Sequence, residues 1–176
     1  MRGDRRYYGR DLFVAGYLFR TEVDDYIEQV EVAPGVSTFV NRAGGTIEGV
    51  ELEGAFALPE GLRLTWAGQQ QRGRDGGEPL ASIPADRVEI GLSLERGRWS
   101  AQGRLQHRFA KDDPGAEETA IGDADLLSAA VGYRIGEDLE LRVHGSNLLD
   151  ETYLPSADEL AVPGPGRSLG LSLRWR

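Results

Sequence analysis

The feature that most constrains this chain is a period of two in its apolar residues. The final segment carries an apolar side chain at every second position: Leu169, Leu171, Leu173 and Trp175. Because successive side chains of a β-strand point to opposite faces, this pattern predicts a strand with one apolar and one polar face. Glycine accounts for 24 of 176 residues, about twice its usual share. Since glycine is costly inside helices, the sequence favours an all-β fold.

The same alternation predicts eight strands, with an N-terminal tail over residues 1–9 before them. The strands are expected over residues 10–32, 37–58, 61–73, 84–96, 98–110, 123–136, 138–150 and 166–176. Asp24 and Asp25 are expected to interrupt the first strand. Short turns alternate with longer polar links, as in an outer-membrane β-barrel with short periplasmic turns and long extracellular loops.

Composition excludes several classes of protein. The formal net charge of −9 argues against nucleic-acid binding, and the absence of cysteine excludes disulfides and thiolate metal sites. No apolar run is long enough for a transmembrane helix. The first residues lack the apolar core of a signal peptide. No sequence motif of a catalytic site is present, so we expect neither an enzyme nor a bound cofactor.

Two motifs carry a resemblance to a known family. Residues 147–153 read Asn-Leu-Leu-Asp-Glu-Thr-Tyr, and residues 163–167 read Pro-Gly-Pro-Gly-Arg before the final strand. Upstream, residues 41–53 read Asn-Arg-Ala-Gly-Gly-Thr-Ile-Glu-Gly-Val-Glu-Leu-Glu. In this order they resemble the C-terminal part of TonB-dependent outer-membrane receptors. Leu149 stands where phenylalanine is commoner in that family.

The resemblance implies an antiparallel transmembrane β-barrel segment over residues 10–176, part of a 22-stranded barrel whose plug domain is absent. Such receptors lie in the bacterial outer membrane and import metal complexes: ferric siderophores, haem, zinc or copper. The loops look closest to the zinc and copper subgroup. The implied partners are the lipid bilayer, the barrel-assembly machinery, the metal complex, and the TonB system through the plug. As a fragment, the chain is expected not to transport alone.

The resemblance also implies roles for particular residues. Structural roles fall to the motif residues Asn41, Gly49, Glu51, Glu53, Asn147, Asp150, Tyr153, Gly166 and Arg167. We expect Asn147 and Asp150 to organise the top of a strand through side-chain to backbone hydrogen bonds. The alternating residues Leu169, Leu171, Leu173 and Trp175 are read as the signal for barrel assembly.

Candidate ligand contacts lie in an acidic loop containing Asp112, Asp113, Glu117 and Glu118. Carboxylates of this kind attract hard cations such as Ca²⁺, although a solvated charged loop has the same composition. The only two histidines, His107 and His144, are predicted on opposite faces of the sheet, so no metal site is expected.

The glutamates of the upstream motif are expected to have a structural role. We expect Glu51 and Glu53 to pair with arginines of the polar face such as Arg63, Arg104 or Arg108, and not to act in catalysis.

Two other functions remain open from the sequence. One is a self-contained eight-stranded outer-membrane protein with a structural or adhesive role, because eight strands can close a narrow barrel. The other is a soluble β-barrel that binds a ligand, because alternation alone does not say which face points outward.

Overall fold

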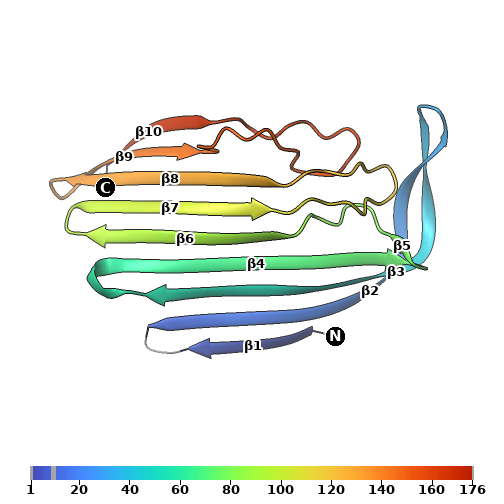
Figure 1. The fold of residues 1–176 in the computed structure, drawn as a ribbon, viewed down its shortest axis with the longest axis horizontal. Helices are drawn as coiled ribbons and strands as arrows, with labels where there is room; N and C mark the ends of the chain where they lie inside the picture. The colour runs from blue at the N-terminus through green and yellow to red at the C-terminus, as the bar shows by residue number, and fades with distance from the viewer. Residues whose placement is uncertain (1, 9–10, 176) are drawn as a thin grey trace.

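A computed structural model describes residues 2–8 and 11–175 and shows one antiparallel sheet (Figure 1). The strands run in the order β1-β2-β3-β4-β6-β7-β8-β9-β10, with the short β5 paired to β4. Their bounds are β1 Arg2–Tyr8, β2 Leu12–Ala33, β3 Val36–Ala57, β4 Leu62–Asp75, β5 Glu78–Pro79, β6 Arg87–Arg96, β7 Trp99–Arg108, β8 Ala124–Ile135, β9 Leu139–Ser146 and β10 Ser168–Trp175. No helix among these residues has the length and apolar character needed to cross a membrane.

The eight expected strands are all present, as β2, β3, β4 and β6 to β10. The prediction of an N-terminal tail is wrong for Arg2–Tyr8, which forms β1 against β2 in the register Arg2 to Phe19. This stretch lacks clear alternation, and its place in the sheet comes from backbone hydrogen bonds to the neighbouring strand. Met1 and Gly9 of the expected tail lie outside the described residues.

The register confirms that the sheet has two unlike faces. Directly paired residues share a face, and apolar residues pair with apolar residues from strand to strand: Phe56 with Leu64, Leu64 with Leu92, Leu105 with Leu127, Val131 with Val143 and Leu141 with Leu173. This apolar face is open to the surroundings, with Leu171 70% exposed. Serine, glutamine, arginine and glutamate occupy the opposite face.

Short and long connections lie at opposite ends of the strands, as predicted (Figure 1). The turn end carries a 3-10 turn at Pro59–Gly61, the β6–β7 turn and the β8–β9 turn. The loop end carries the segments that follow β5, β7 and β9, over residues 80–86, 109–123 and 147–167. The strands therefore hold three long loops together at one rim of the sheet.

The β2–β3 hairpin extends beyond the other strands at the loop end. Each of its strands has 22 residues, and in Figure 1 its outer part turns upward beyond the loop ends of the other strands. The bend falls where Asp25 takes a φ of 55° and Gly44 a φ of 155°. The expected break at Asp24 and Asp25 is a bend instead, because pairing resumes between Tyr26 and Arg42. We call residues 26–42 the distal hairpin.

The close packing of Trp66 over Gly54 on the apolar face allows a test of the register between β3 and β4. A Cβ added at Gly54 of β3 would lie 2.1 Å from Cζ2 of Trp66. Gly54→Ala should therefore destabilise the barrel by about 1–3 kcal/mol through overpacking. Gly103→Ala is the matched control, because nothing lies within 4 Å of its added Cβ. The measurement is the temperature at which the detergent-resistant folded barrel unfolds in gel electrophoresis. Equal unfolding temperatures for both variants would contradict the packing of Trp66 over Gly54.

Candidate functional site

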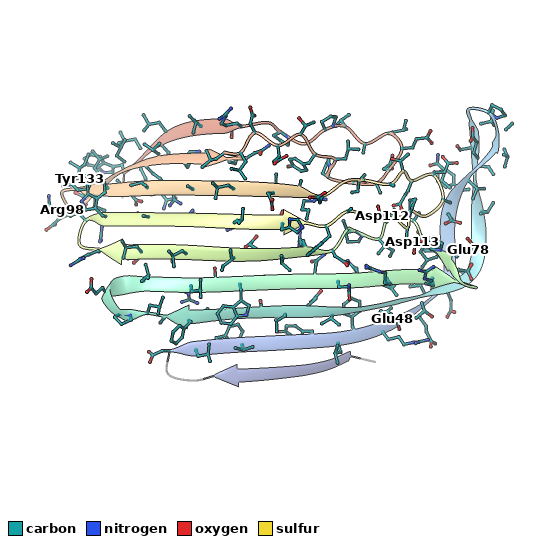
Figure 2. All side chains as sticks on the ribbon, in the orientation of Figure 1. Glu48, Glu78, Arg98, Asp112, Asp113 and Tyr133 are labelled. Atoms are coloured by element: carbon teal, nitrogen blue, oxygen red, sulfur yellow. The ribbon has the colours of Figure 1, made fainter. Side chains whose placement is uncertain are left out.

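The acidic candidates of the sequence meet at the loop end, between the distal hairpin and the segment after β5. Figure 2 shows Asp112, Asp113 and Glu78 gathered where the distal hairpin leaves the sheet. Three backbone segments that are far apart in sequence come together here.

Lys111 and Glu118 form the most buried charged pair of the loop end. The Nζ of Lys111 lies 2.5 Å from Oε2 of Glu118, and their side chains are only 10% and 5% exposed. Lys111 also donates to the carbonyl of Ile83 at 2.8 Å. Glu118 accepts the backbone N–H groups of Gly115 and Ser82, each at 2.7 Å. The pair therefore joins the segment after β5 to the loop after β7.

Glu117 joins the same loop to the distal hairpin. Its carboxylate accepts hydrogen bonds from the Ser37 hydroxyl at 3.0 and 3.1 Å and from Nε2 of Gln29 at 3.3 Å. Tyr26 supplies a second link, because its hydroxyl donates to the carbonyl of Ala81 at 3.0 Å. Burial raises the pKa of the Tyr26 hydroxyl, and the negative charges of Glu28 and Glu118 raise it further.

The two aspartates differ in their surroundings. Asp113 accepts a hydrogen bond from Nη2 of Arg74 at 2.6 Å, and Arg74 also donates to the carbonyl of Gly77 at 2.9 Å. Asp112 is exposed. Within the described part of the chain, no group of three or more His, Asp or Glu side chains is placed to hold a metal ion. Three of the four acidic candidates, Asp113, Glu117 and Glu118, thus use their carboxylates in contacts within the protein.

The Asn147 side chain organises the loop after β9. It is 6% exposed, with a backbone φ of 47°. Its amide donates to the carbonyls of Glu151 at 2.8 Å and Pro165 at 3.0 Å, and its oxygen accepts the N–H of Glu151 at 3.0 Å. These bonds end β9 at Ser146, four residues earlier than the alternation predicted.

Asp150 and Arg167 close the base of the same loop. Asp150 accepts the backbone N–H of Arg167 at 3.0 Å and a guanidinium N–H at 2.8 Å. Tyr153 packs so closely on Gly164 that an added Cβ there would lie 2.3 Å from the ring. Arg108 lies 5.6 Å above the Tyr153 ring. We call Asn147, Asp150 and Arg167 the loop clasp.

The residues of the upstream motif lie along β3. A Cβ added at Gly49 would meet the Phe19 ring at 2.7 Å, so this position leaves room for that ring. The Tyr17 hydroxyl donates to Glu53 at 3.4 Å, and Asn41 donates to Asp25 at 3.2 Å beside the bend.

The expected pairing of Glu51 and Glu53 is wrong for Arg104 and Arg108, whereas pairing with Arg63 of the neighbouring strand β4 stays a prediction. Arg104 lies 3.4 Å from Glu89 instead, and Arg108 donates to the carbonyl of Pro155 at 2.7 Å. The reason is distance across the sheet, because β3 and β7 are separated by β4 and β6.

The histidines lie on opposite faces, as predicted. His107 shares the apolar face with its paired neighbour Val88, and its Nδ1 lies 2.9 Å from Oδ1 of Asp125. His144 pairs with Gly170 on the polar face. The sequence did not single out the Lys111–Glu118 pair. Its one signal was that Lys111 is the only lysine of the chain.

The Lys111–Glu118 pair generates a prediction about the loop end. Glu118→Gln leaves the Lys111 charge buried without its partner, which typically costs about 3–5 kcal/mol. We expect residues 80–86 and 109–123 to become sensitive to protease added outside intact cells. Asp112→Asn, an exposed position in the same loop, is the control and should digest like the unaltered protein. Equal digestion of the two variants would contradict the role of the pair.

The loop clasp generates a prediction about pH. The backbone N–H of Arg167, its charge and its side-chain hydrogen bond hold the pKa of Asp150 below its ordinary value of 3.8. A carboxyl group with a lowered pKa contributes stability above its unfolded pKa and loses it as the pH falls through the folded pKa. Acidification below about pH 4 should therefore lower the protection of backbone amides in residues 147–167, measured as exchange relative to the intrinsic rate at the same pH. Asp150→Asn should exchange faster at neutral pH and lose this added pH response. A parallel acid response in that variant would contradict the assignment.

Comparisons with known proteins agree with this architecture. The sequence profile described as "TonB dependent receptor-like, beta-barrel" matches residues 4–148. Comparison with curated proteins gives no significant match. Among solved structures, the fold is similar to the copper transporter OprC, with a TM-score of 0.88, 19% identity and 99% of this chain covered. It is also similar to the ferric yersiniabactin uptake receptor FyuA from Yersinia pestis, with a TM-score of 0.77, 19% identity and 97% covered.

The pyoverdine receptor FpvA from Pseudomonas aeruginosa PAO1 is a third similar structure, with a TM-score of 0.76, 18% identity and 98% of this chain covered. The chain spans 30%, 28% and 28% of the lengths of these three proteins. At such identities the likeness shows the fold. The profile match covers well over half of the sequence. The chain therefore belongs to the family of TonB-dependent receptors and forms part of their outer-membrane β-barrel.

Proposed function

We propose that this chain is the C-terminal barrel portion of an outer-membrane receptor that imports metal complexes with energy from the TonB system. The observation that carries the proposal is family membership together with the organisation of the loop end. The strands present an apolar face to lipid and hold three loops and the distal hairpin at one rim. This rim is where an extracellular ligand first meets such a barrel. The role is that of a receptor, not of an enzyme.

The ligand class follows from the names of the similar proteins. They include a copper transporter and receptors for ferric yersiniabactin and pyoverdine. We propose a metal complex as ligand, with copper or zinc, ferric siderophore and haem as the candidates to be compared. Among the acidic candidates we favour Asp112 as a ligand contact, because it is exposed while the carboxylates of Asp113, Glu117 and Glu118 are engaged.

Besides the ligand, we propose three partners for this barrel segment. The lipid bilayer covers the apolar face, and the TonB system acts through a plug domain outside this chain. The final strand, with Leu169, Leu171, Leu173 and Trp175 on the apolar face, is proposed as the signal to the barrel-assembly machinery. All four side chains are more than half exposed and so are available to a partner or to lipid.

Two observations favour the receptor over the other functions. In the described sheet β1 and β10 lie at opposite edges, whereas a self-contained eight-stranded barrel pairs its first and last strands (Figure 1). A soluble ligand binder would bury its apolar face, and here that face is exposed from β2 to β10. A small adhesive protein is therefore the weaker candidate.

The test is uptake of radioactive metals by cells that lack the receptor containing this segment. Deletion should abolish most uptake of one metal among iron, copper and zinc, supplied free or as a siderophore or haem complex. Loss of TonB should give the same defect. Asp112→Asn should weaken binding of that ligand, and Glu60→Gln at the turn end is the control. Unchanged uptake of every metal complex after deletion would refute the proposal, and unchanged binding by Asp112→Asn would refute only the ligand contact.

A further inference from the structure

The outer part of β3 has an edge with which no described strand pairs. β2 pairs with β3 from Val36 to Phe56, but β4 pairs with it only from Thr46 to Ala57. Among the described residues, β3 therefore has a strand on one side alone over residues 36–45. Figure 1 shows this part of the hairpin beyond the end of β4. An edge of this kind presents a row of backbone N–H and C=O groups to another extended chain.

The loops on the same side of β3 do not pair with this edge. They are the segments over residues 80–86, 109–123 and 147–167. They contact the distal hairpin through side chains, as in the hydrogen bond from the Tyr26 hydroxyl to the carbonyl of Ala81 at 3.0 Å. Two of the loops pair with each other instead, because the N–H of Thr119 donates to the carbonyl of Ala157 at 2.7 Å. Within the described part of the chain, the edge is therefore open.

The sequence of the edge favours pairing with another strand. Residues 36–41 read Val-Ser-Thr-Phe-Val-Asn, without proline, glycine or a charged residue. Short segments rich in β-branched and aromatic residues readily pair as strands. Exposed edges in natural proteins usually carry a lysine or a proline that prevents such pairing, and residues 36–41 have neither. Val36 is 54% exposed and Phe39 is 72% exposed, so both side chains can contact an added strand.

Carboxylates lie at both ends of residues 36–41. At the outer end, Glu117 accepts hydrogen bonds from the Ser37 hydroxyl at 3.0 and 3.1 Å, and Glu31 is the β2 partner of Ser37. At the inner end, Asp25 accepts a hydrogen bond from the side-chain amide of Asn41 at 3.2 Å. The serine and asparagine donors are neutral and do not cancel the negative charge of these carboxylates.

The charge of the hairpin selects the occupant of the edge. Residues 24–42 contain four acidic residues and one arginine. A second copy of this edge would bring like charges together, which opposes pairing. An added strand that carries lysine or arginine would bring opposite charges together, which favours pairing. The edge therefore fits a basic extended polypeptide better than a second receptor.

We propose that residues 36–41 bind an extended basic segment of a secreted protein as an added strand. The backbone of the segment pairs with β3, and its basic side chains lie near Asp25, Glu31 and Glu117. The partner is a secreted protein because the loop end of such a barrel faces the outside of the cell. The proposal rests on the outer-membrane location of the barrel and does not depend on the transported metal complex.

The experiment measures binding of the fluorescent peptide Lys-Val-Lys-Val-Lys-Val-Lys to the complete receptor in detergent micelles by fluorescence anisotropy. Two control peptides separate backbone pairing from charge attraction. One has every backbone nitrogen methylated, so it keeps its side chains and charge but cannot donate a backbone hydrogen bond. The other has glutamate in place of lysine. We expect each change to weaken binding about tenfold or more, because several hydrogen bonds or all charge pairs are lost.

Receptor variants locate the binding site. Asp25→Asn/Glu31→Gln removes two charges beside the edge and keeps the hydrogen-bond acceptors, so it should weaken binding of the lysine peptide about fivefold. Glu137→Gln/Asp138→Asn is the matched control, because both residues are exposed and lie in the β8–β9 turn at the opposite end of the strands. This control should bind the peptide like the unaltered receptor. Folding of each variant is checked by the heat shift of the barrel in gel electrophoresis.

The outcomes separate strand addition from its alternatives. Equal binding of the lysine peptide and its methylated form would indicate charge attraction without backbone pairing and would overturn the proposal. No binding of the lysine peptide, equal binding of the glutamate peptide, or equal weakening in the turn-end control would also overturn it. A receptor dimer that the peptide does not dissociate would assign the edge to a second copy instead. If the double variant does not fold, unchanged binding by Glu31→Gln alone would decide against the proposal.

Discussion

The structure depends on one constraint, the continuous backbone hydrogen-bond ladder that joins each strand to the next. In lipid, water is not available to bond exposed N–H and C=O groups, so strands can cross a bilayer only when their neighbours satisfy them. The order from β1 to β10 meets this need across the whole sheet except at the two outer edges. With every backbone fixed in register, the side chains must alternate between lipid and interior. The period of two in the sequence is the direct consequence of that ladder.

At the loop end, side-chain hydrogen bonds and an ion pair connect segments that the backbone pairing of the sheet does not join. Glu117 ties the loop after β7 to the distal hairpin, while Lys111 and Glu118 tie it to the segment after β5. These links make the distal hairpin and two loops one connected unit. A ligand that displaces one of these loops must also break bonds to the other two elements. Carboxylates that looked like ligand contacts in the sequence therefore act first as the bonds that shape the rim.

The sequence predicts the fold wherever a local pattern carries the information. The eight strands, the alternating turn lengths, and the opposite faces of His107 and His144 all follow from alternation read along the chain. A pairing is not predictable from the sequence where the partner is distant or the alternation is absent. Arg2–Tyr8 has no clear alternation, so its pairing with β2 was missed. Arg104 is expected from the sequence to pair with glutamates of β3, but it lies 3.4 Å from Glu89 on the adjacent strand.

The sequence by itself determined the class of fold and the family. Face alternation and the motifs at 41–53 and 147–167 are local features, which can be recognised along the chain without knowing which strands pair. Only the tertiary structure decided which charges meet. Glu118 becomes a buried partner of Lys111, and Arg20, Glu48 and Arg72 form one row, because strand register and loop packing bring residues from separate segments together. The physical reason is that a charged side chain has no periodic signature of its own. Its role depends on the burial and the partners that the sheet supplies.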